Sequence, residues 1–185
     1  MGYYREMLPF AQRLHSSYVV FHHNNCKVLD VNRGTMLRTA DENLKELTEL
    51  SGKAGIPVAV ENVGIKAMGN VLLEQEAFIA ECRKLSNPVL IDIGHAHANH
   101  WDLRHVMEEL KDRIISYHVH NNDGVHDCHQ RIYNGTLDMN AFLYDVRELT
   151  PEADLVLEYA PDVAEDKAGI MEDIKTLCPF RETLS

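Results

Sequence analysis

Five short apolar runs in this sequence each end in a side chain that can bind a metal ion or carry a proton. In chain order these side chains are His22, Glu61, Asp92, His118 and Glu158. Imidazole and carboxylate ligands together suit Mn²⁺, Zn²⁺, Fe²⁺ or Co²⁺. Taken alone, a carboxylate such as Glu61 would more simply cap a helix or face solvent. Several carboxylates in one dry cleft, however, repel one another unless a cation or shared protons neutralise them. The set therefore predicts a divalent metal site.

More side chains of the same chemistry lie beside these positions, and eight of the 11 histidines fall between His95 and His129. His95 comes just past the third apolar run. His120 shares a strand face with His118, because side chains alternate along a strand. The segment after residue 120 reads as a long loop, and such loops on the functional face usually carry function. We expect substrate binding by His22, His95 and His120, and a further metal site at Asp127 and His129.

Other residues that could do chemistry are interpreted as having no role. Six histidines are expected on the surface or on helix faces: His15, His23, His97, His100, His105 and His126. The four cysteines are widely spaced, which favours reduced thiols in a cytoplasmic compartment over a disulfide framework. Cys128 has no basic partner that would mark it as a nucleophile. No glycine-rich phosphate-binding motif occurs.

The apolar runs themselves are typical of the strands of a buried parallel sheet. They cover residues 18–22, 57–61, 88–92, 114–118 and 154–158. Amphipathic helices are expected between them. Thr39 and Glu42 form a capping-box pattern, which predicts a helix start. Asp102 and Asp138 are expected to cap two further helices, and the last helix is expected over residues 164–177.

The composition excludes several classes of protein. A chain of 185 residues, 45% hydrophobic and 25% charged, is typical of one globular domain over residues 1–185. The formal net charge of −11 makes a general nucleic-acid binder unfavourable. No apolar run reaches the roughly 18 to 20 residues of a membrane helix, and the first residues lack a signal-peptide pattern. We therefore expect a soluble, cytoplasmic protein.

Five strand–helix units suit either an open doubly wound sheet or part of a (β/α)₈ barrel. The length favours the open sheet, because a full barrel takes about 250 residues. The strand ends favour the barrel, because its functional groups gather at the carboxyl ends of its strands. We expect the α/β class with about five parallel β-α units, arranged as either an open sheet or a partial barrel.

These motifs resemble the xylose-isomerase-like TIM barrel superfamily, which includes sugar isomerases, ketose 3-epimerases and endonuclease IV. The resemblance spans nearly the whole chain and rests on VVFHH (19–23), VAVEN (58–62), LIDIGHAHANHWDL (90–103), YHVHNNDGVHDCHQRIYNGTLD (117–138) and LVLEY (155–159). It implies that the four-ligand metal centre of the epimerases is matched by Glu61, Asp92, His118 and Glu158. It also implies that His95 matches a substrate-contacting histidine.

The sequence departs from this family in its number of units. The matched strands are the fourth to the eighth, so the resemblance implies a partial (β/α)₈ TIM barrel of about five parallel β-α units, N-terminally truncated and corresponding to the C-terminal part. Five units would leave edge strands and apolar surface uncovered. We therefore expect a homo-oligomer, most simply a twofold dimer with contacts near residues 1–14 and the first strand. Tyr133-Asn-Gly135 replaces a tighter G-x-G, and Asn121 replaces a common aspartate.

Two enzymatic functions and one non-enzymatic state fit these residues. The first is a metal-dependent sugar isomerase or epimerase that transfers a proton next to a carbonyl through an enediolate, with Glu61 and Glu158 as the catalytic pair. Its substrate would be a small sugar or a related hydroxy-ketone. The alternative is an endonuclease IV-like phosphodiesterase at abasic DNA sites, which the net charge disfavours. The third is a non-catalytic remnant of the barrel.

Overall fold

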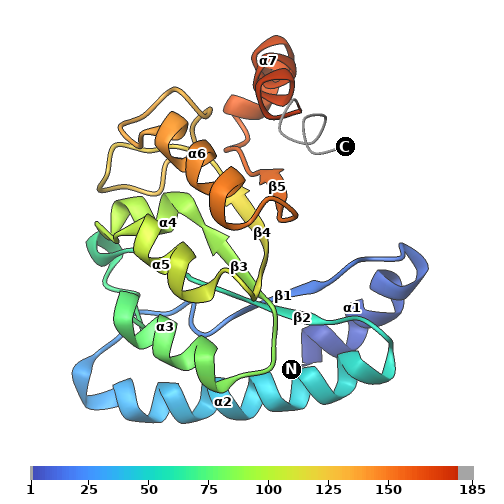
Figure 1. Ribbon diagram of the computed structural model, residues 1–185. Helices are drawn as coiled ribbons and strands as arrows, with labels where there is room; N and C mark the ends of the chain where they lie inside the picture. The colour runs from blue at the N-terminus through green and yellow to red at the C-terminus, as the bar shows by residue number, and fades with distance from the viewer. Residues whose placement is uncertain (1, 179–185) are drawn as a thin grey trace.

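The centre of the computed structural model, which describes residues 2–178, is one sheet of five parallel strands. The strands are β1 (Val19–His22), β2 (Val58–Glu61), β3 (Val89–Asp92), β4 (Ile114–Val119) and β5 (Asp154–Leu157). Their order in space is their order in the sequence. A doubly wound sheet reverses direction at a switch point, whereas a barrel adds each strand on the same side. The predicted partial (β/α)₈ barrel is therefore confirmed (Figure 1).

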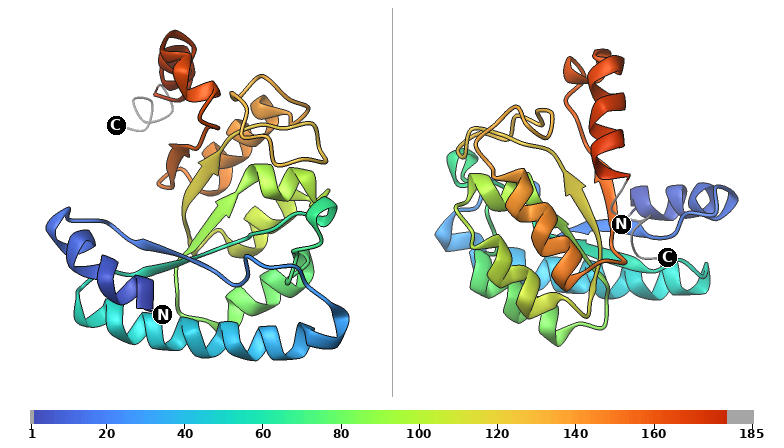
Figure 2. Two further views of the ribbon diagram at one scale, coloured as in Figure 1. Left: turned by 180° about the vertical axis from the view of Figure 1, so that it is seen from behind. Right: turned by 45° about the horizontal axis from the view of Figure 1, so that its top comes forward.

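The helices lie along the sheet and at its two ends (Figures 1 and 2). They are α1 (Gly2–Arg13), α2 (Asp30–Lys53), α3 (Gln75–Lys84), α4 (Ile93–Ala98), α5 (Leu103–Leu110), α6 (Met139–Leu149) and α7 (Lys167–Leu177), with short 3₁₀ turns η1 (Lys66–Met68) and η2 (Val163–Glu165). Among the described residues, no helix has both the length and the apolar character needed to cross a membrane.

The hydrophobic core lies between the sheet and α2, α3, α5 and α6. Leu47 of α2, Phe78 of α3 and Met107 of α5 are almost fully buried in one cluster with the strand side chains. Every residue of β2 and β3 is buried, which explains why these strands read as continuous apolar runs rather than as alternating patterns. The core thus fixes the strands whose carboxyl ends carry the candidate site residues.

The predicted caps of two helices are confirmed, but the predicted start of α2 is wrong. Oδ1 of Asp102 accepts the backbone N–H of His105, and Oδ1 of Asp138 accepts that of Ala141, both at 3.0 Å. Helix α2 begins at Asp30, so the capping-box pattern at Thr39 lies inside the helix. Asp30 places a carboxylate in the first turn, where the helix dipole favours negative charge.

The two ends of the sheet differ in how they are covered. At the β1 end, α1 lies beside the strand, and the Tyr4 hydroxyl donates a hydrogen bond to the carbonyl of Val20 at 3.0 Å. At the β5 end, the side chains of the strand alternate between exposed and half-buried. Val156 is 39% exposed and lies in a groove between β5 and α7.

Candidate metal centre

The reactive strand-end residues gather at one edge of the sheet. In the strand register, His22 lies opposite Glu61 and Asp92 lies opposite His118. Glu158 follows directly after β5, beside β4. The backbone thus brings residues from five separate segments to the same end of the barrel, where such folds carry their functional groups.

Four of these side chains form one compact cluster. Glu61, Asp92, His118 and Glu158 each offer one potential ligand atom, and these atoms all lie within 4.8 Å of one another. Glu61 and Asp92 are buried, His118 is half-buried and Glu158 is partly open to solvent. The cluster therefore has a closed floor and one accessible side, as a site that admits a ligand requires.

Glu61 lies at the floor of this cluster between two histidines. Its Oε2 lies 2.8 Å from Nε2 of His22, and its Oε1 lies 2.9 Å from Nδ1 of His118. Burial alone would raise the pKa of Glu61, but hydrogen bonds from His118 and His22 outweigh burial and lower the pKa to about 2. Glu61 is thus a carboxylate held in its charged form.

Nδ1 of His118 is the point on which the carboxylates converge. It lies 2.9 Å from Glu61, 3.1 Å from Glu158 and 4.0 Å from Asp92. Burial lowers the pKa of His118, but the hydrogen bonds to Glu158 and Glu61 outweigh it and raise the pKa to about 10. The cluster therefore stabilises a positive charge at this point. A divalent cation fits this set of three carboxylates and one imidazole nitrogen.

Asp92 is held by contacts on several sides and has no exposed surface. It caps α4, because its Oδ1 accepts the backbone N–H of His95 at 2.6 Å. Nε2 of His120 lies 3.1 Å from each carboxylate oxygen. Burial would raise the pKa of Asp92, but the charges of His95 and His120 lower it. His120 is itself fully buried, so it holds Asp92 from within the protein interior.

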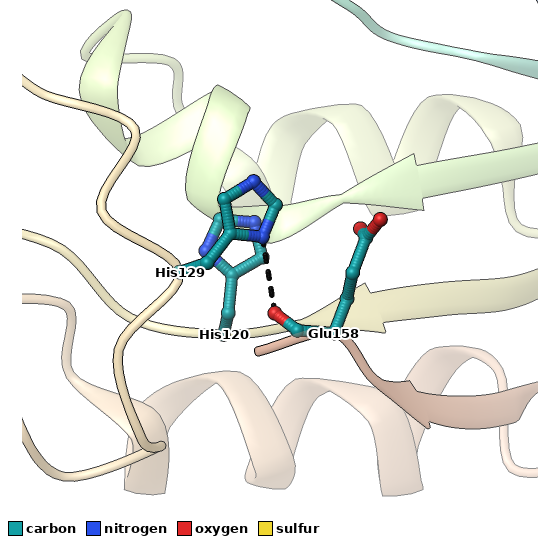
Figure 3. Close-up of side chains that lie close together, drawn as sticks. All are labelled: His120, His129 and Glu158. Carbon is teal, nitrogen blue, oxygen red and sulfur yellow. Dashed lines mark hydrogen bonds between the residues drawn. The ribbon is translucent and has the colours of Figure 1, made fainter. Parts of the chain in front are cut away.

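A second cluster lies next to the first and is centred on Asp127. Its Oδ2 lies 3.2 Å from Nε2 of His95, and its Oδ1 lies 3.2 Å from Nε2 of His129. Hydrogen bonds from His129 and His95 outweigh burial and lower the pKa of Asp127. Nδ1 of His129 is 3.0 Å from the backbone carbonyl of Glu158, which links the two clusters (Figure 3). The rings of His120 and His129 stack at 3.9 Å.

The position of one histidine differs from expectation, and one structural residue was not predicted. His23 was expected at the surface, but this is wrong: it is 8% exposed, with its ring edge against Phe21. The second residue is Asn62, for which the sequence analysis predicts no role. Its side chain donates to the carbonyl of Asp92 at 2.9 Å and accepts that residue's N–H at 2.8 Å. Its place directly after Glu61, within the VAVEN motif, is the sequence signal for it.

The comparisons with known proteins point to one family. A protein from Methanocaldococcus jannaschii without an assigned activity is 24% identical over 151 residues, which cover 80% of this chain and 57% of that protein. The chain therefore spans little more than half the length of this relative.

Two crystal structures share the fold. A D-tagatose 3-epimerase-like protein has a TM-score of 0.73 at 22% identity, covering 98% of this chain and 69% of its own. The probable 3-DHS dehydratase AsbF of Bacillus anthracis has a TM-score of 0.71 at 12% identity, covering 95% and 69%.

A family model described as the xylose isomerase-like TIM barrel matches residues 2–180. This match spans nearly the whole chain, and the sequential parallel sheet agrees with it. The chain belongs to the xylose isomerase-like TIM barrel family.

Proposed function

We propose that this chain carries the active site of a metal-dependent sugar isomerase or epimerase. The observation that carries the proposal is the convergence of Glu61, Asp92 and Glu158 on Nδ1 of His118 within a span of 4.8 Å. The family and the epimerase-like name of one structural neighbour support sugar chemistry. The substrate is a small sugar or a related hydroxy-ketone, and the reaction moves a proton next to its carbonyl.

Glu61, Asp92, His118 and Glu158 would hold the divalent cation, which is Mn²⁺, Zn²⁺, Co²⁺ or Fe²⁺ by the chemistry of these ligands. When bound, such a cation supplies Lewis-acid stabilisation of negative charge on the substrate oxygens. A carboxylate oxygen of Glu61 and one of Glu158 each lie close to Nδ1 of His118, at 2.9 and 3.1 Å. In the proposed reaction one of these carboxylates removes the proton from the substrate carbon and the other returns it to the enediolate.

Three histidines are assigned to the surroundings of the substrate. The side chain of His22 is 35% exposed, and its Nε2 lies 2.8 Å from Glu61. The side chain of His95 is 12% exposed and lies between the two clusters. We assign substrate contacts to His22 and His95. His120 has no exposed surface, so we assign it the task of holding Asp92 rather than of reaching the sugar directly.

The second cluster supports the alternative of a metal-dependent phosphodiesterase at abasic DNA sites. Asp127 bridges His95 and His129, an arrangement with which Asp127 and His129 would bind an additional metal ion. The net charge of −11 opposes binding to a phosphate backbone. We therefore place this activity second to sugar chemistry.

Solvent exchange tests the proposal. The purified chain, loaded with Mn²⁺ or Co²⁺, is incubated in D₂O with a panel of ketoses, and deuterium on the substrate carbon is followed by NMR. We expect exchange that disappears in Glu61→Gln and in metal-free protein. Incision of abasic-site DNA without exchange on any sugar would favour the phosphodiesterase. Protein that binds no metal and shows neither activity would be a non-catalytic remnant of the barrel.

A further inference from the structure

Helix α1 has two apolar faces, and the protein covers only one of them. On the inner face, Leu8 is 8% exposed and the hydroxyl of Tyr4 donates to the backbone of β1. The other face carries four large apolar side chains at the spacing i, i+4, i+7 and i+11, with exposed fractions between 40% and 77%. These side chains, which we call the α1 stripe, are Tyr3, Met7, Phe10 and Leu14.

The α1 stripe points away from α2 and runs along α1, which contains Pro9 in its interior. Arg5 pairs with Glu46 of α2, and the Gln12 amide donates to the carbonyl of Ala54 at 3.1 Å. At about 100° per residue, Arg5 and Gln12 lie on the side of the helix opposite the stripe. The N–H of Leu14 still donates to the carbonyl of Phe10 at 2.9 Å, so the helical geometry extends through the whole stripe.

We infer that the α1 stripe binds the same stripe of a second copy of this chain, with the two helices antiparallel about a twofold axis. The spacing of the stripe equals two successive d and a positions of a heptad, which is the seam by which two helices pair. In the antiparallel arrangement, Tyr3 lies against Leu14 of the second copy, and Met7 lies against Phe10. A twofold axis closes this contact, so the assembly stops at a dimer.

The charges beside the stripe identify the occupant as a second copy. Glu6 and Arg13 are exposed and lie on the same flank of the stripe, seven residues apart. Antiparallel pairing therefore sets Glu6 of each copy opposite Arg13 of the other, which gives two attractive pairs. Neither side chain is held in an ion pair within the described part of the chain. A surface of this pattern complements itself.

The size of the α1 stripe sets the expected strength of the dimer. A standard stable interface takes about 800 Å² from each partner, which is more than four side chains on one short helix provide. We therefore expect a dimer that dissociates on dilution, with a dissociation constant on the order of 10 µM. The contact lies outside the candidate metal centre, so it stands independently of the proposed function.

A charge-exchange experiment on the full chain tests the pairing and its direction. In sedimentation velocity, Glu6→Arg and Arg13→Glu each place like charges opposite one another at both crossings. We expect each variant alone to dimerise about tenfold more weakly than the unmodified chain. An equal mixture of the two variants has complementary charges at both crossings, so we expect it to regain dimerisation. A fluorescent label on one variant identifies the mixed dimer.

A second pair of variants separates the stripe from general surface stickiness. Met7→Lys combined with Phe10→Lys should abolish the dimer, since it places charges in the seam. Tyr144→Lys combined with Met171→Lys should leave it unchanged, because these residues are 59% and 53% exposed on α6 and α7. A monomer throughout the micromolar to millimolar range would overturn the inference. So would a dimer that survives the first pair of substitutions, or a mixture that associates no better than its components.

Discussion

Nε2 of His120 lies 3.1 Å from both carboxylate oxygens of Asp92, and neither side chain has any exposed surface. This contact depends on the residue at position 94. Gly94 passes so close to the ring that a Cβ there would lie 1.9 Å from Cε1 of His120. Any side chain at position 94 would therefore push His120 away from Asp92, a proposed metal ligand.

We expect Gly94→Ala to weaken Mn²⁺ binding by about tenfold to a hundredfold, which is the usual effect of losing a group that orients a metal ligand. Titration calorimetry on the purified proteins measures the dissociation constant for Mn²⁺. Gly34→Ala is the matched control, because a Cβ there meets nothing within 4 Å and the residue lies inside α2. The control should bind metal normally and unfold at a slightly higher temperature. Equal metal affinity in both variants would show that His120 does not hold Asp92 for metal binding.

The assignment of Glu158 as a ligand is tested by a pair of charge-equivalent substitutions. Glu158→Gln removes a carboxylate whose Oε2 lies 3.1 Å from Nδ1 of His118. Asp162→Asn removes the same charge from an exposed residue at the start of η2, whose side chain caps no helix. We expect the metal affinity of Glu158→Gln to fall by about a hundredfold, so that the protein loses its metal on dialysis. Asp162→Asn should keep normal affinity and metal content. A similar loss in both would mean that only long-range charge matters.

Metal binding should release a proton from His118. The pKa of His118 is raised to about 10 in the metal-free protein, so its ring is charged at pH 7, whereas Glu61, with its pKa lowered to about 2, is already ionised. A cation that takes Nδ1 must displace this proton. Calorimetry in buffers of different ionisation enthalpy should give about one proton released per cation, and the apparent affinity should rise with pH up to about 10. A pH-independent affinity would place the cation elsewhere.

The strands and their ends could be predicted from the sequence because burial leaves a strong signal there. All four residues of β2 and of β3 are buried, and each strand ends on a buried carboxylate, Glu61 or Asp92. Apolar runs of only about four to eight residues favour buried strands over buried helices, which are longer. Convergence then follows from parallel topology alone.

The starts of α2 and α4 and the burial of His23 could not be predicted in the same way. The first turns of α2 include Gly34 and exposed polar residues, and the helix is held by later residues such as Leu44 and Leu47 that pack on the sheet. Helix α4 has six residues and contains Gly94, so locally it reads as a loop. Asp92 caps it through a local contact with the N–H of His95, while the same carboxylate is held by His120 from a distant segment, and that tertiary contact leaves no local signal.

His23 gives the remaining pH-dependent prediction, because it is buried without a compensating contact. It is 8% exposed, and neither ring nitrogen has a hydrogen-bond partner among the described residues. Burial lowers the pKa of His23 from its ordinary 6.5 to about 4. Between these two values the unfolded chain binds a proton that the folded chain does not, so protonation favours unfolding.

The free energy of unfolding should therefore fall as the pH is lowered from 6.5 to 4, with His23 contributing roughly 3 kcal/mol over the full range. Urea titrations at pH 7 and pH 5 measure this, with His23→Leu as the test variant. Other groups also titrate in this range, so the quantity of interest is the difference between variant and unmodified chain. As the pH falls from 7 to 5, the free energy of unfolding of His23→Leu should rise by about 2 kcal/mol relative to that of the unmodified chain.

His15→Asn is the control, at an exposed position with φ 53° that asparagine tolerates, and its free energy of unfolding should show no such change relative to the unmodified chain. Parallel pH profiles for His23→Leu and the unmodified chain would mean that the ring is hydrated or paired in solution, because only a neutral, dry imidazole produces the predicted slope.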